Sequence, residues 1–290
     1  MRAFEAGSEI TLPVEDSGAG RGSRVLALVP AYNPRPAALA ATLKSLLTQT
    51  SATDIALVDD GSAPPVEVPS FAREKVSLLR LPENGGITAA LTAGVQFACD
   101  AGYEFICRLD VGDLSYPRRV ERQLAFLDAH PDVDLVGSYA RILDAGGRTL
   151  FHHGVDGGAA AVAAYLRKNA PFRHSTFFIR TSALARHGGY KCAFDGAEDY
   201  ELLLRLAVRG RVDCLSETLV DYVEDPRGIT ETRRALQLRR RLAAQLTHLA
   251  PLSPAAYAGV LRTVVIMALP RRVARMATLR TWARQAAPGT

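Results

Sequence analysis

The feature that most constrains the fold of this chain is a series of short apolar runs, each followed by a cluster of polar residues. Four such runs, rich in Val, Leu and Ile, occupy positions 25–30, 54–60, 76–81 and 103–110. Between them, apolar residues recur with helical spacing at Leu39, Leu43, Leu46 and Leu47, and again from Ala89 to Cys99. Strand and helix in regular alternation predict an α/β fold with a mostly parallel central sheet flanked by helices, built with right-handed crossovers.

The polar clusters that follow the four runs are PAYN, DDGS, ENGG and LDVGD, at positions 30–33, 59–62, 83–86 and 109–113. Parallel strands end at the same edge of a sheet, and ligands of open α/β sheets bind outside those carboxyl ends. The sequence therefore predicts one ligand site assembled from these four segments.

The second part of the chain predicts further elements of both kinds. We expect a helix over 118–133, a strand and hairpin turning at Ala145 to Gly147, a strand over 172–180, a helix from GAEDYE to Gly210, and a strand over 212–223. From about Thr232 the composition changes to Arg, Ala and Leu in helical spacing. These patterns predict three parts: a flexible leader over 1–23, an α/β domain over 24–228 whose halves are 24–117 and 118–228, and a basic helical region over 229–290.

The charge of the chain is concentrated in that last region. The net charge is +5, and the segment from Arg233 to Arg284 contains no Asp or Glu. A basic block of this kind favours an anionic partner, either lipid headgroups or nucleic acid, unless it is only a solvated helical face. Because Tyr257 and Trp282 are its only aromatic residues, we expect no nucleic acid. Apolar faces such as VLRTVVIMAL suit an interfacial helix, so we expect 230–285 to contact an anionic membrane surface; the alternative is that this region packs on the α/β domain or on a second subunit.

The expected location follows from what the sequence lacks. There is no run of about eighteen apolar residues to span a membrane, and the first 24 residues have no apolar segment typical of a secretory signal. The four cysteines form no CxxC pair and indicate buried or half-buried thiols in a reducing compartment. We therefore expect a cytoplasmic protein, peripheral on the inner face of the cell membrane.

Two acidic clusters at strand ends each allow more than one interpretation. Asp110 and Asp113 can hold a metal and its phosphate ligand, cap a helix, or close a turn. Asp59 and Asp60 can form an ordinary turn, or one of them can accept hydrogen bonds from a nucleobase or ribose. The ENGG segment precedes a helix, where backbone amides can face a phosphate or simply complete a turn.

The remaining candidates lie in the second half. Glu198 and Asp199 begin a helix, where acidic side chains are favourable for the helix dipole, but one of them can also face the cleft as a general base. His174 is either a metal or phosphate ligand or a core histidine.

Taken in order, VPAYN, VDDGS, ENGG, LDVGD followed by PRRVERQ, HSTFFIR and GAEDYELLLRL resemble the family 2 glycosyltransferases, which have a GT-A fold. The resemblance covers roughly residues 24 to 225. It implies an inverting enzyme that moves a sugar from a nucleotide-diphosphate sugar to a hydroxyl group of a saccharide or lipid-linked saccharide. At family level it implies a role in bacterial exopolysaccharide, capsule or lipopolysaccharide assembly.

The resemblance also assigns roles to individual residues. It places the nucleoside beside Pro30, Ala31 and Tyr32, the base at Asp60, and the diphosphate near Asn84 and Gly85. It makes Asp110 the first residue of the DxD motif, which binds the ribose and a divalent cation, Mn or Mg. It makes Asp199 the base that deprotonates the acceptor hydroxyl, with Glu198 beside it on the acceptor side.

The sequence departs from the family pattern at Gly112, which stands where the second Asp of DxD is expected. Three arrangements remain open. The cation is held by Asp110 and Asp113 together with His174, it is held mostly by the diphosphate, or the enzyme works without it and uses Arg108, Arg118 or Arg173 as the positive charge. The alternative function is a catalytically degenerate GT-A-like module that binds a nucleotide sugar. A nucleotidyltransferase would need a glycine-rich loop with a lysine after the first strand, and VPAYNPRP has neither residue.

Overall fold

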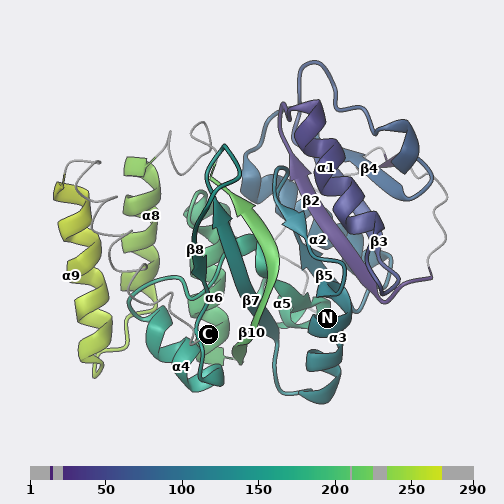
Figure 1. Cartoon of the computed structure of the whole chain (residues 1–290). Helices are drawn as coiled ribbons and strands as arrows, with labels where there is room; N and C mark the ends of the chain where they lie inside the picture. The colour runs from purple at the N-terminus through teal and green to yellow at the C-terminus, as the bar shows by residue number, and fades with distance from the viewer. Residues whose placement is uncertain (1–13, 16–21, 210, 225–233, 270–290) are drawn as a thin grey trace.

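The structure is a computed structural model that describes residues 14–15, 22–209, 211–224 and 234–269. One central sheet runs through it in the order β1-β4-β3-β2-β5-β9-β7-β10-β6, with β8 paired to β7 (Figure 1). The strands of the first half are β1 (Val14–Glu15), β2 (Val25–Ala31), β3 (Asp54–Asp59), β4 (Val76–Arg80), β5 (Phe105–Arg108) and β6 (Leu114–Ser115). Strands β4, β3, β2 and β5 are mutually parallel, which confirms the predicted α/β class. The predicted leader lies outside the described residues except for 22–23 and β1, which pairs with β4.

Helices cover both faces of the sheet because successive residues of its strands alternate between two apolar cores. Leu26 and Leu28 of β2 join one core, which includes side chains of α2 (Ile87–Asp100). Val25, Ala27 and Val29 of the same strand join the other core. That second core contains side chains of α1 (Pro36–Leu47) and α3 (Arg119–Ala129). A strand buried on both faces is the pattern expected for a central parallel strand, so the carboxyl end of β2 is held rigidly.

The second half extends the same sheet. It contains β7 (Leu135–Leu143), β8 (Thr149–His153), β9 (Phe178–Arg180) and β10 (Val212–Val223). Strands β7 and β8 form the expected antiparallel hairpin, and β10 lies parallel to β7. Strand β9 runs antiparallel to both β5 and β7, so the sheet is mixed at this point.

One strand is shorter than the sequence predicts. Of the strand expected over 172–180, only β9 is extended, and His174–Thr176 form a 3-10 turn, η2. The turn is closed by backbone bonds from Thr176 to Arg173 and from Phe177 to His174. Because of this turn, the Ser175 side chain points to Asp110 and Asp113 after the end of β5, and Ser175 does not pair with a neighbouring strand.

The second half also contains the helices α4 (Gly158–Leu166), α5 (Thr181–His187) and α6 (Glu198–Arg209), with the short turn η3 (Cys192–Phe194) before α6. The first two were not expected from the sequence. Gly210, predicted to end α6, lies outside the described residues. Of the cysteines, Cys107 and Cys214 are buried and Cys99 is half-buried, but Cys192 is exposed, contrary to expectation.

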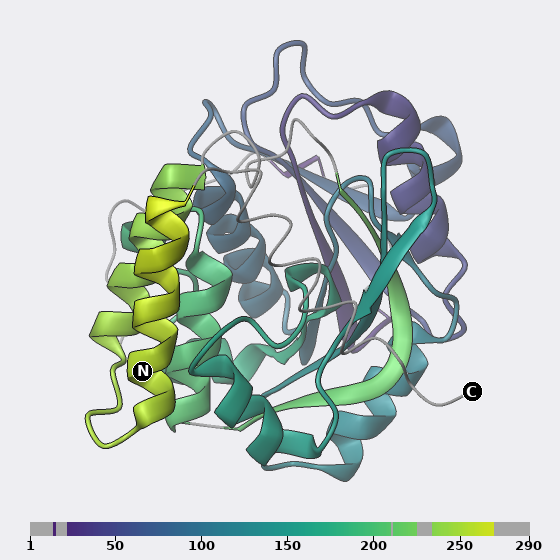
Figure 2. The same cartoon turned by 60° about the vertical axis from the view of Figure 1, so that its left-hand side comes forward.

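The basic region contains two helices, α8 (Arg234–Thr247) and α9 (Pro254–Ala268). Figures 1 and 2 show α8 beside α6, with α9 on the outer side of α8. Helix α9 starts with Ser253 as its N-cap and Pro254 in its first turn, a pairing that helix starts favour. Residues 225–233 and 270–290 of this region lie outside the described part. No helix within the described residues is long and apolar enough to cross a bilayer.

Candidate active site

The predicted nucleoside-binding residues lie at the end of β2. Pro30 and Ala31 are buried within the strand, while Tyr32 beyond it is 55% exposed. The amide of Asp60 donates to the Ala31 carbonyl oxygen at 2.9 Å, which ties the ends of β2 and β3 together. Tyr32 is therefore the one residue of the three whose side chain is open to a ligand.

Asp60 joins the two loops that follow β3 and β4. Its Oδ1 accepts a hydrogen bond from the Gly85 amide at 2.8 Å, and its Oδ2 accepts one from the Asn84 side-chain amide at 3.1 Å. Burial raises the pKa of this carboxyl group, although hydrogen bonds from the Gly85 and Gly86 amides oppose the rise. The three residues expected at the base and the diphosphate are thus brought together, with the loop amides directed at Asp60.

The residues beside Asp60 are structural. Asp59 accepts hydrogen bonds from the amides of Ser62 at 2.9 Å and Val66 at 3.0 Å, and it is fully buried. Gly61 has φ +67° and its backbone passes so close to Glu83 that a Cβ would lie 2.4 Å from the Glu83 carbonyl carbon. Only glycine fits both conditions, so the DDGS turn is locked against the ENGG loop.

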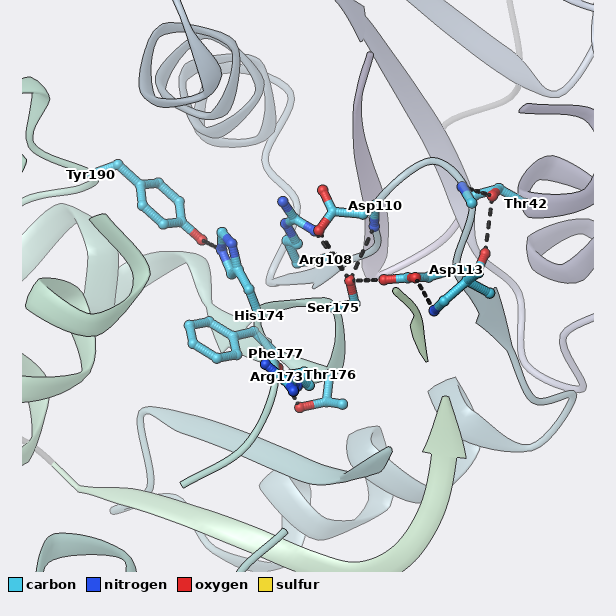
Figure 3. A network of polar contacts seen from close by, with 12 residues as sticks. Thr42, Arg108, Asp110, Asp113, Arg173, His174, Ser175, Thr176, Phe177 and Tyr190 are labelled. Carbon is cyan, nitrogen blue, oxygen red and sulfur yellow. Dashed lines mark hydrogen bonds and ion pairs between the residues drawn. The ribbon is translucent and has the colours of Figure 1, made fainter. Parts of the chain in front are cut away.

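The segment expected to open a DxD motif lies after the end of β5, where Arg108 forms an ion pair with Asp110 (Figure 3). The guanidinium group is 2% exposed, whereas the Asp110 side chain is 38% exposed. The nearby Asp110 carboxylate raises the pKa of Arg108 against the opposing effect of burial. A buried cation therefore faces an accessible carboxylate at the edge where a ligand is expected.

Ser175 of η2 lies between the two acidic residues of this segment (Figure 3). Its hydroxyl group is 3.2 Å from Asp110 Oδ2 and in closer contact with Asp113 Oδ2. The other oxygen of Asp113 accepts a hydrogen bond from the Val223 amide at 3.0 Å. Asp113 is 3% exposed, and burial together with the charge of Asp110 raises its pKa to about 7. The carboxyl group of Asp113 is thus buried and hydrogen-bonded within the protein, and it is not open to a ligand.

Gly112 occupies a position that suits glycine. It has φ +106°, and its amide donates to Thr42 Oγ1 at 2.9 Å. The same Thr42 hydroxyl donates to the Asp113 carbonyl oxygen at 2.9 Å. The loop between the two aspartates is therefore fixed to α1, in a backbone conformation that an Asp would adopt only with strain.

His174 does not join the acidic residues. Its Nε2 is 2.8 Å from the Tyr190 hydroxyl, and its ring packs edge-on against Phe177 with centroids 4.8 Å apart. Burial and the positive charge of Arg108 hold its pKa well below the usual value. No three His, Cys, Asp or Glu side chains among the described residues are grouped to hold a metal. The expected ligand set of Asp110, Asp113 and His174 is thus not assembled in this structure.

The acidic pair at the start of α6 faces the same cation. Glu198 Oε2 accepts a hydrogen bond from the Gly196 amide at 2.7 Å, and Asp199 Oδ1 accepts one from the Tyr200 amide at 2.6 Å. Burial and the neighbouring Asp199 raise the pKa of Glu198 to about 8. Burial also raises the pKa of Asp199, while Arg108 acts to lower it in both groups. Arg108 therefore lies within electrostatic reach of both acidic motifs.

Several residues of the site were not selected from the sequence. Asp195 accepts a hydrogen bond from Thr88 Oγ1 at 2.8 Å and so joins the loop before α6 to the first turn of α2. Ser175 and Tyr190 contact the predicted residues directly, but a lone Ser or Tyr carries no sequence signal. Arg108 was named only as one of three possible cations. Arg118, another of the three, is exposed and paired with Glu121.

A cavity of about 380 Å³ lies elsewhere, lined by residues such as Tyr103, Phe105 and Arg180. Phe105 is the first residue of β5 and Asp110 lies two positions beyond its last, so this cavity is at the opposite edge of the sheet from Asp110.

Comparison with known proteins finds one family. The model described as "Glycosyl transferase family 2" matches residues 27–194. An uncharacterized glycosyltransferase of Haemophilus influenzae is 30% identical over 209 residues, covering 69% of this chain and 75% of that protein. The amylovoran biosynthesis glycosyltransferase AmsE of Erwinia amylovora is 30% identical over 237 residues, covering 76% of this chain and 86% of that protein.

Among solved structures, TarS from S. aureus matches with a TM-score of 0.62 at 18% identity. The match covers 87% of this chain and 45% of the longer TarS chain. The TarS segment 1–349 in complex with UDP-GlcNAc matches with a TM-score of 0.61, also at 18% identity, and covers 83% of this chain and 72% of that one. At this identity the likeness shows a shared fold.

Proposed function

The chain belongs to glycosyl transferase family 2 and is a glycosyltransferase of the GT-A fold, and from this premise we propose that it assembles a bacterial surface or extracellular polysaccharide. The donor would be a nucleotide-diphosphate sugar and the acceptor a hydroxyl group of a saccharide or lipid-linked saccharide. AmsE is named for amylovoran biosynthesis, and the TarS segment was solved with UDP-GlcNAc. The first name supports a role in polysaccharide assembly, and the second supports a nucleotide-sugar donor.

The observation that carries the proposal is that Arg108 interacts with both acidic motifs. It pairs with Asp110 at the donor edge and acts electrostatically on Asp199 at the start of α6. Transfer of a sugar to a hydroxyl needs a leaving diphosphate whose charge is neutralised and a carboxylate that takes the acceptor's proton. A sugar donor bound at the strand ends would have its diphosphate near Asp110 and Arg108 and its sugar toward Asp199.

We propose a single displacement with inversion at the anomeric carbon. The acceptor oxygen forms the new bond to that carbon while the bond to the diphosphate oxygen breaks, and the acceptor's proton moves to Asp199. With a pKa of about 8, Glu198 is mostly protonated at neutral pH. It therefore adds less negative charge beside Asp199 than an ordinary carboxylate would.

The Asp110 carboxylate fits a divalent cation whose other ligands come from the phosphates of the substrate. Mg²⁺ is commonly held by one or two carboxylates together with substrate phosphates, not by a cage of protein ligands alone. Asp110 is accessible for this role, while Asp113 is engaged by Ser175 and Val223. When bound, Mn or Mg would neutralise charge on the diphosphate, and Arg108 would hold Asp110 in place.

The decisive experiment is a panel of nucleotide sugars assayed with wild type, Asp199→Asn and the exposed control Asp132→Asn, each with EDTA and with added Mn or Mg. Loss of a general base lowers the rate by about 10²–10⁴, so we expect transfer to vanish in Asp199→Asn while donor binding persists. Asp132→Asn should behave as wild type. An active Asp199→Asn would reject the base, and full activity in EDTA would reject the cation.

The alternative, a binding module without catalysis, is favoured only by Gly112 in place of the second Asp. It makes a distinct prediction in the same assay. A wild-type chain that binds a nucleotide sugar tightly but transfers it to no saccharide acceptor would replace the proposal of transfer with this one.

We also propose that α9 contacts an anionic membrane. Its exposed apolar side chains Tyr257, Leu261, Val264 and Val265 recur at intervals that place them on one side of a helix. Its opposite side, with Ala256, Gly259 and Thr263, is buried against the protein. An outward apolar stripe in a segment without acidic residues suits the interface of an anionic bilayer, where a lipid-linked acceptor would be found.

A further inference from the structure

Helix α8 is attached to the helix that carries the acidic pair. The ring of Tyr200, the residue after Asp199, lies under the Arg241 guanidinium group with 4.5 Å between Cζ and the ring centroid. Arg241 Nη2 also donates to the Asn169 side-chain oxygen at 2.8 Å and to the Lys168 carbonyl oxygen at 3.1 Å. The guanidinium group is therefore held on one side by α6 and on the other by the segment after α4.

A buried polar chain connects the same tyrosine to α9. Gln245 Nε2 donates to the Tyr200 hydroxyl at 3.3 Å, and Gln245 Oε1 accepts from Thr263 Oγ1 at 2.8 Å. The Tyr200 hydroxyl donates in turn to the Leu166 carbonyl oxygen at 2.8 Å. Tyr200, Gln245 and Thr263 are each at most 5% exposed. Buried networks whose members are all hydrogen-bonded specify one arrangement of the elements they join.

The next residue of α6 is held by the residue that follows α8. Glu201 Oε1 is 2.9 Å from Nε2 of His248, the residue that follows the end of α8, and the Glu201 carboxylate also pairs with Arg205 and Lys191. Tyr200 is thus held by α8, and Glu201 by the residue directly after that helix. Because the Tyr200 amide donates to Asp199 Oδ1 at 2.6 Å, the position of Tyr200 determines the orientation of the Asp199 carboxylate.

We infer that Arg241 of α8 is a positioning residue for Asp199: it holds Tyr200, and its charge favours the ionised form of the base. The inference rests on the proposed function, since it assumes that Asp199 takes the acceptor's proton. It makes the basic C-terminal region part of the catalytic apparatus as well as a candidate for membrane contact.

The electrostatic part of this role can be set against the other groups near Asp199. Burial raises its pKa, Asp110 acts in the same direction, and Arg108 and Arg241 act to lower it. Glu198 and Tyr190 are the other titratable groups that interact with it. Arg108 comes from β5 and Arg241 from α8, so removal of Arg241 leaves one cation to oppose burial and the neighbouring acids.

The test compares Arg241→Gln, which removes the charge, with Arg241→Lys, which keeps it, and with Arg148→Gln, which removes an exposed charge from the β7–β8 hairpin. For Arg241→Gln we expect kcat to fall about tenfold or more through misplacement of the base, with the donor KM little changed. We also expect the acidic limb of the kcat profile to move to higher pH. In Arg241→Lys the acidic limb of the kcat profile should stay at its wild-type pH, and Arg148→Gln should match wild type in kcat and in pH profile.

Arg241→Met gives a second neutral variant whose aliphatic chain still packs on the Tyr200 ring, in case Arg241→Gln does not fold. If both folded neutral variants keep the wild-type kcat and the wild-type acidic limb, the inference is wrong. A fall in kcat with an unmoved limb would also reject the electrostatic role.

A measurement that needs no activity separates this inference from the proposed function. The Asp199 carboxyl carbon can be titrated by NMR in ¹³C-labelled protein, with Asp199→Asn to assign its signal. The pKa of Asp199 should be higher in Arg241→Gln than in wild type. If wild type transfers no sugar but this shift is present, the proposed function fails and the influence of Arg241 stands; an unchanged pKa overturns the inference alone.

Discussion

Asp113 is a buried carboxyl group whose hydrogen bonds come from the Ser175 hydroxyl and the Val223 amide. Its pKa is raised to about 7 in the folded protein, compared with about 3.9 in an unfolded chain. Between these values the folded state binds the extra proton. Stability from this group is therefore fully present below about pH 4 and is lost as pH rises through about 7.

This linkage predicts the behaviour of Asp113→Asn. Asparagine keeps an oxygen for the Val223 amide and cannot ionise, so the variant should lose less stability than wild type between pH 5 and pH 8. Urea unfolding in EDTA at several pH values measures this, because EDTA removes any effect of a bound cation. Parallel pH dependences for the two proteins would contradict the raised pKa of Asp113. Strongly reduced activation of the variant by Mn would support a ligand role instead.

Single residues show where the sequence is informative and where it is not. Asp60, Asn84 and Gly85 follow adjacent strands, so their meeting could be predicted from the parallel order of the strands alone. The role of Asp113 could not, because whether a carboxylate points outward or inward depends on η2, which brings Ser175 to it from 62 positions away in the chain. The sequence carries no periodic signal for such a contact.

At the scale of elements, Arg205 joins α6 to the end of α5. Its Nη1 donates to the His187 carbonyl oxygen at 2.6 Å, and its Nη2 donates to the Gly189 carbonyl oxygen at 2.7 Å. The guanidinium group also pairs with Glu201 one turn earlier, at 2.9 Å, and both side chains are at most 2% exposed. The last carbonyl groups of a helix have no partner within it, and here Arg205 supplies one.

Arg205→Met should therefore be strongly destabilising. Breaking a buried pair by removing one partner costs about 3–5 kcal/mol because the other charge stays buried. Arg122→Met is the matched control, since Arg122 pairs with Glu217 on the surface, where such pairs contribute about 0–1 kcal/mol. Chemical denaturation of both variants measures the two losses. Equal losses would show that the burial of the Arg205 pair contributes nothing.

The elements themselves were predictable to different degrees. The strands β2, β3 and β4 and the helices α1 and α2 follow from apolar periodicity, because each is buried in a regular pattern. Helix α4 was missed although its sequence GAAAVAAYL is rich in a strong helix former. Gly157 and Gly158, which precede and begin the helix, both have positive φ. Glycines at this point are typical of a loop, so they obscured the helical signal of the alanines.

At the scale of the whole molecule, α9 lies on the outer side of α8 (Figure 2), and the apolar side chains of α9 are exposed while Arg241 and Gln245 of α8 contact α6. A protein truncated before α8 would lose the contacts of Arg241 and Gln245 with α6 and so would not isolate membrane binding. Substitutions on the outer stripe of the full chain test it without disturbing the inner face.

We expect full-length protein to bind vesicles that contain phosphatidylglycerol more tightly than vesicles of phosphatidylcholine alone. The double variant Leu261→Ser, Val265→Ser should weaken that binding about tenfold or more, because each buried apolar side chain contributes about 1.5–3 kcal/mol. Val208→Ser, which changes a 72% exposed residue of α6, is the control. Sedimentation with vesicles measures the effect, and unchanged binding by the double variant would reject this surface.

The family match ends at residue 194, four positions before the acidic pair of α6. Arg108 and Asp110 lie inside the matched segment, whereas Asp199 and its support from Arg241 lie beyond it. A chimera that joins the first part of this chain to the last part of a relative would therefore exchange the proposed base and the helix that contacts its neighbour together. Recombination at this boundary offers a route to new acceptors that leaves the donor end of the sheet intact.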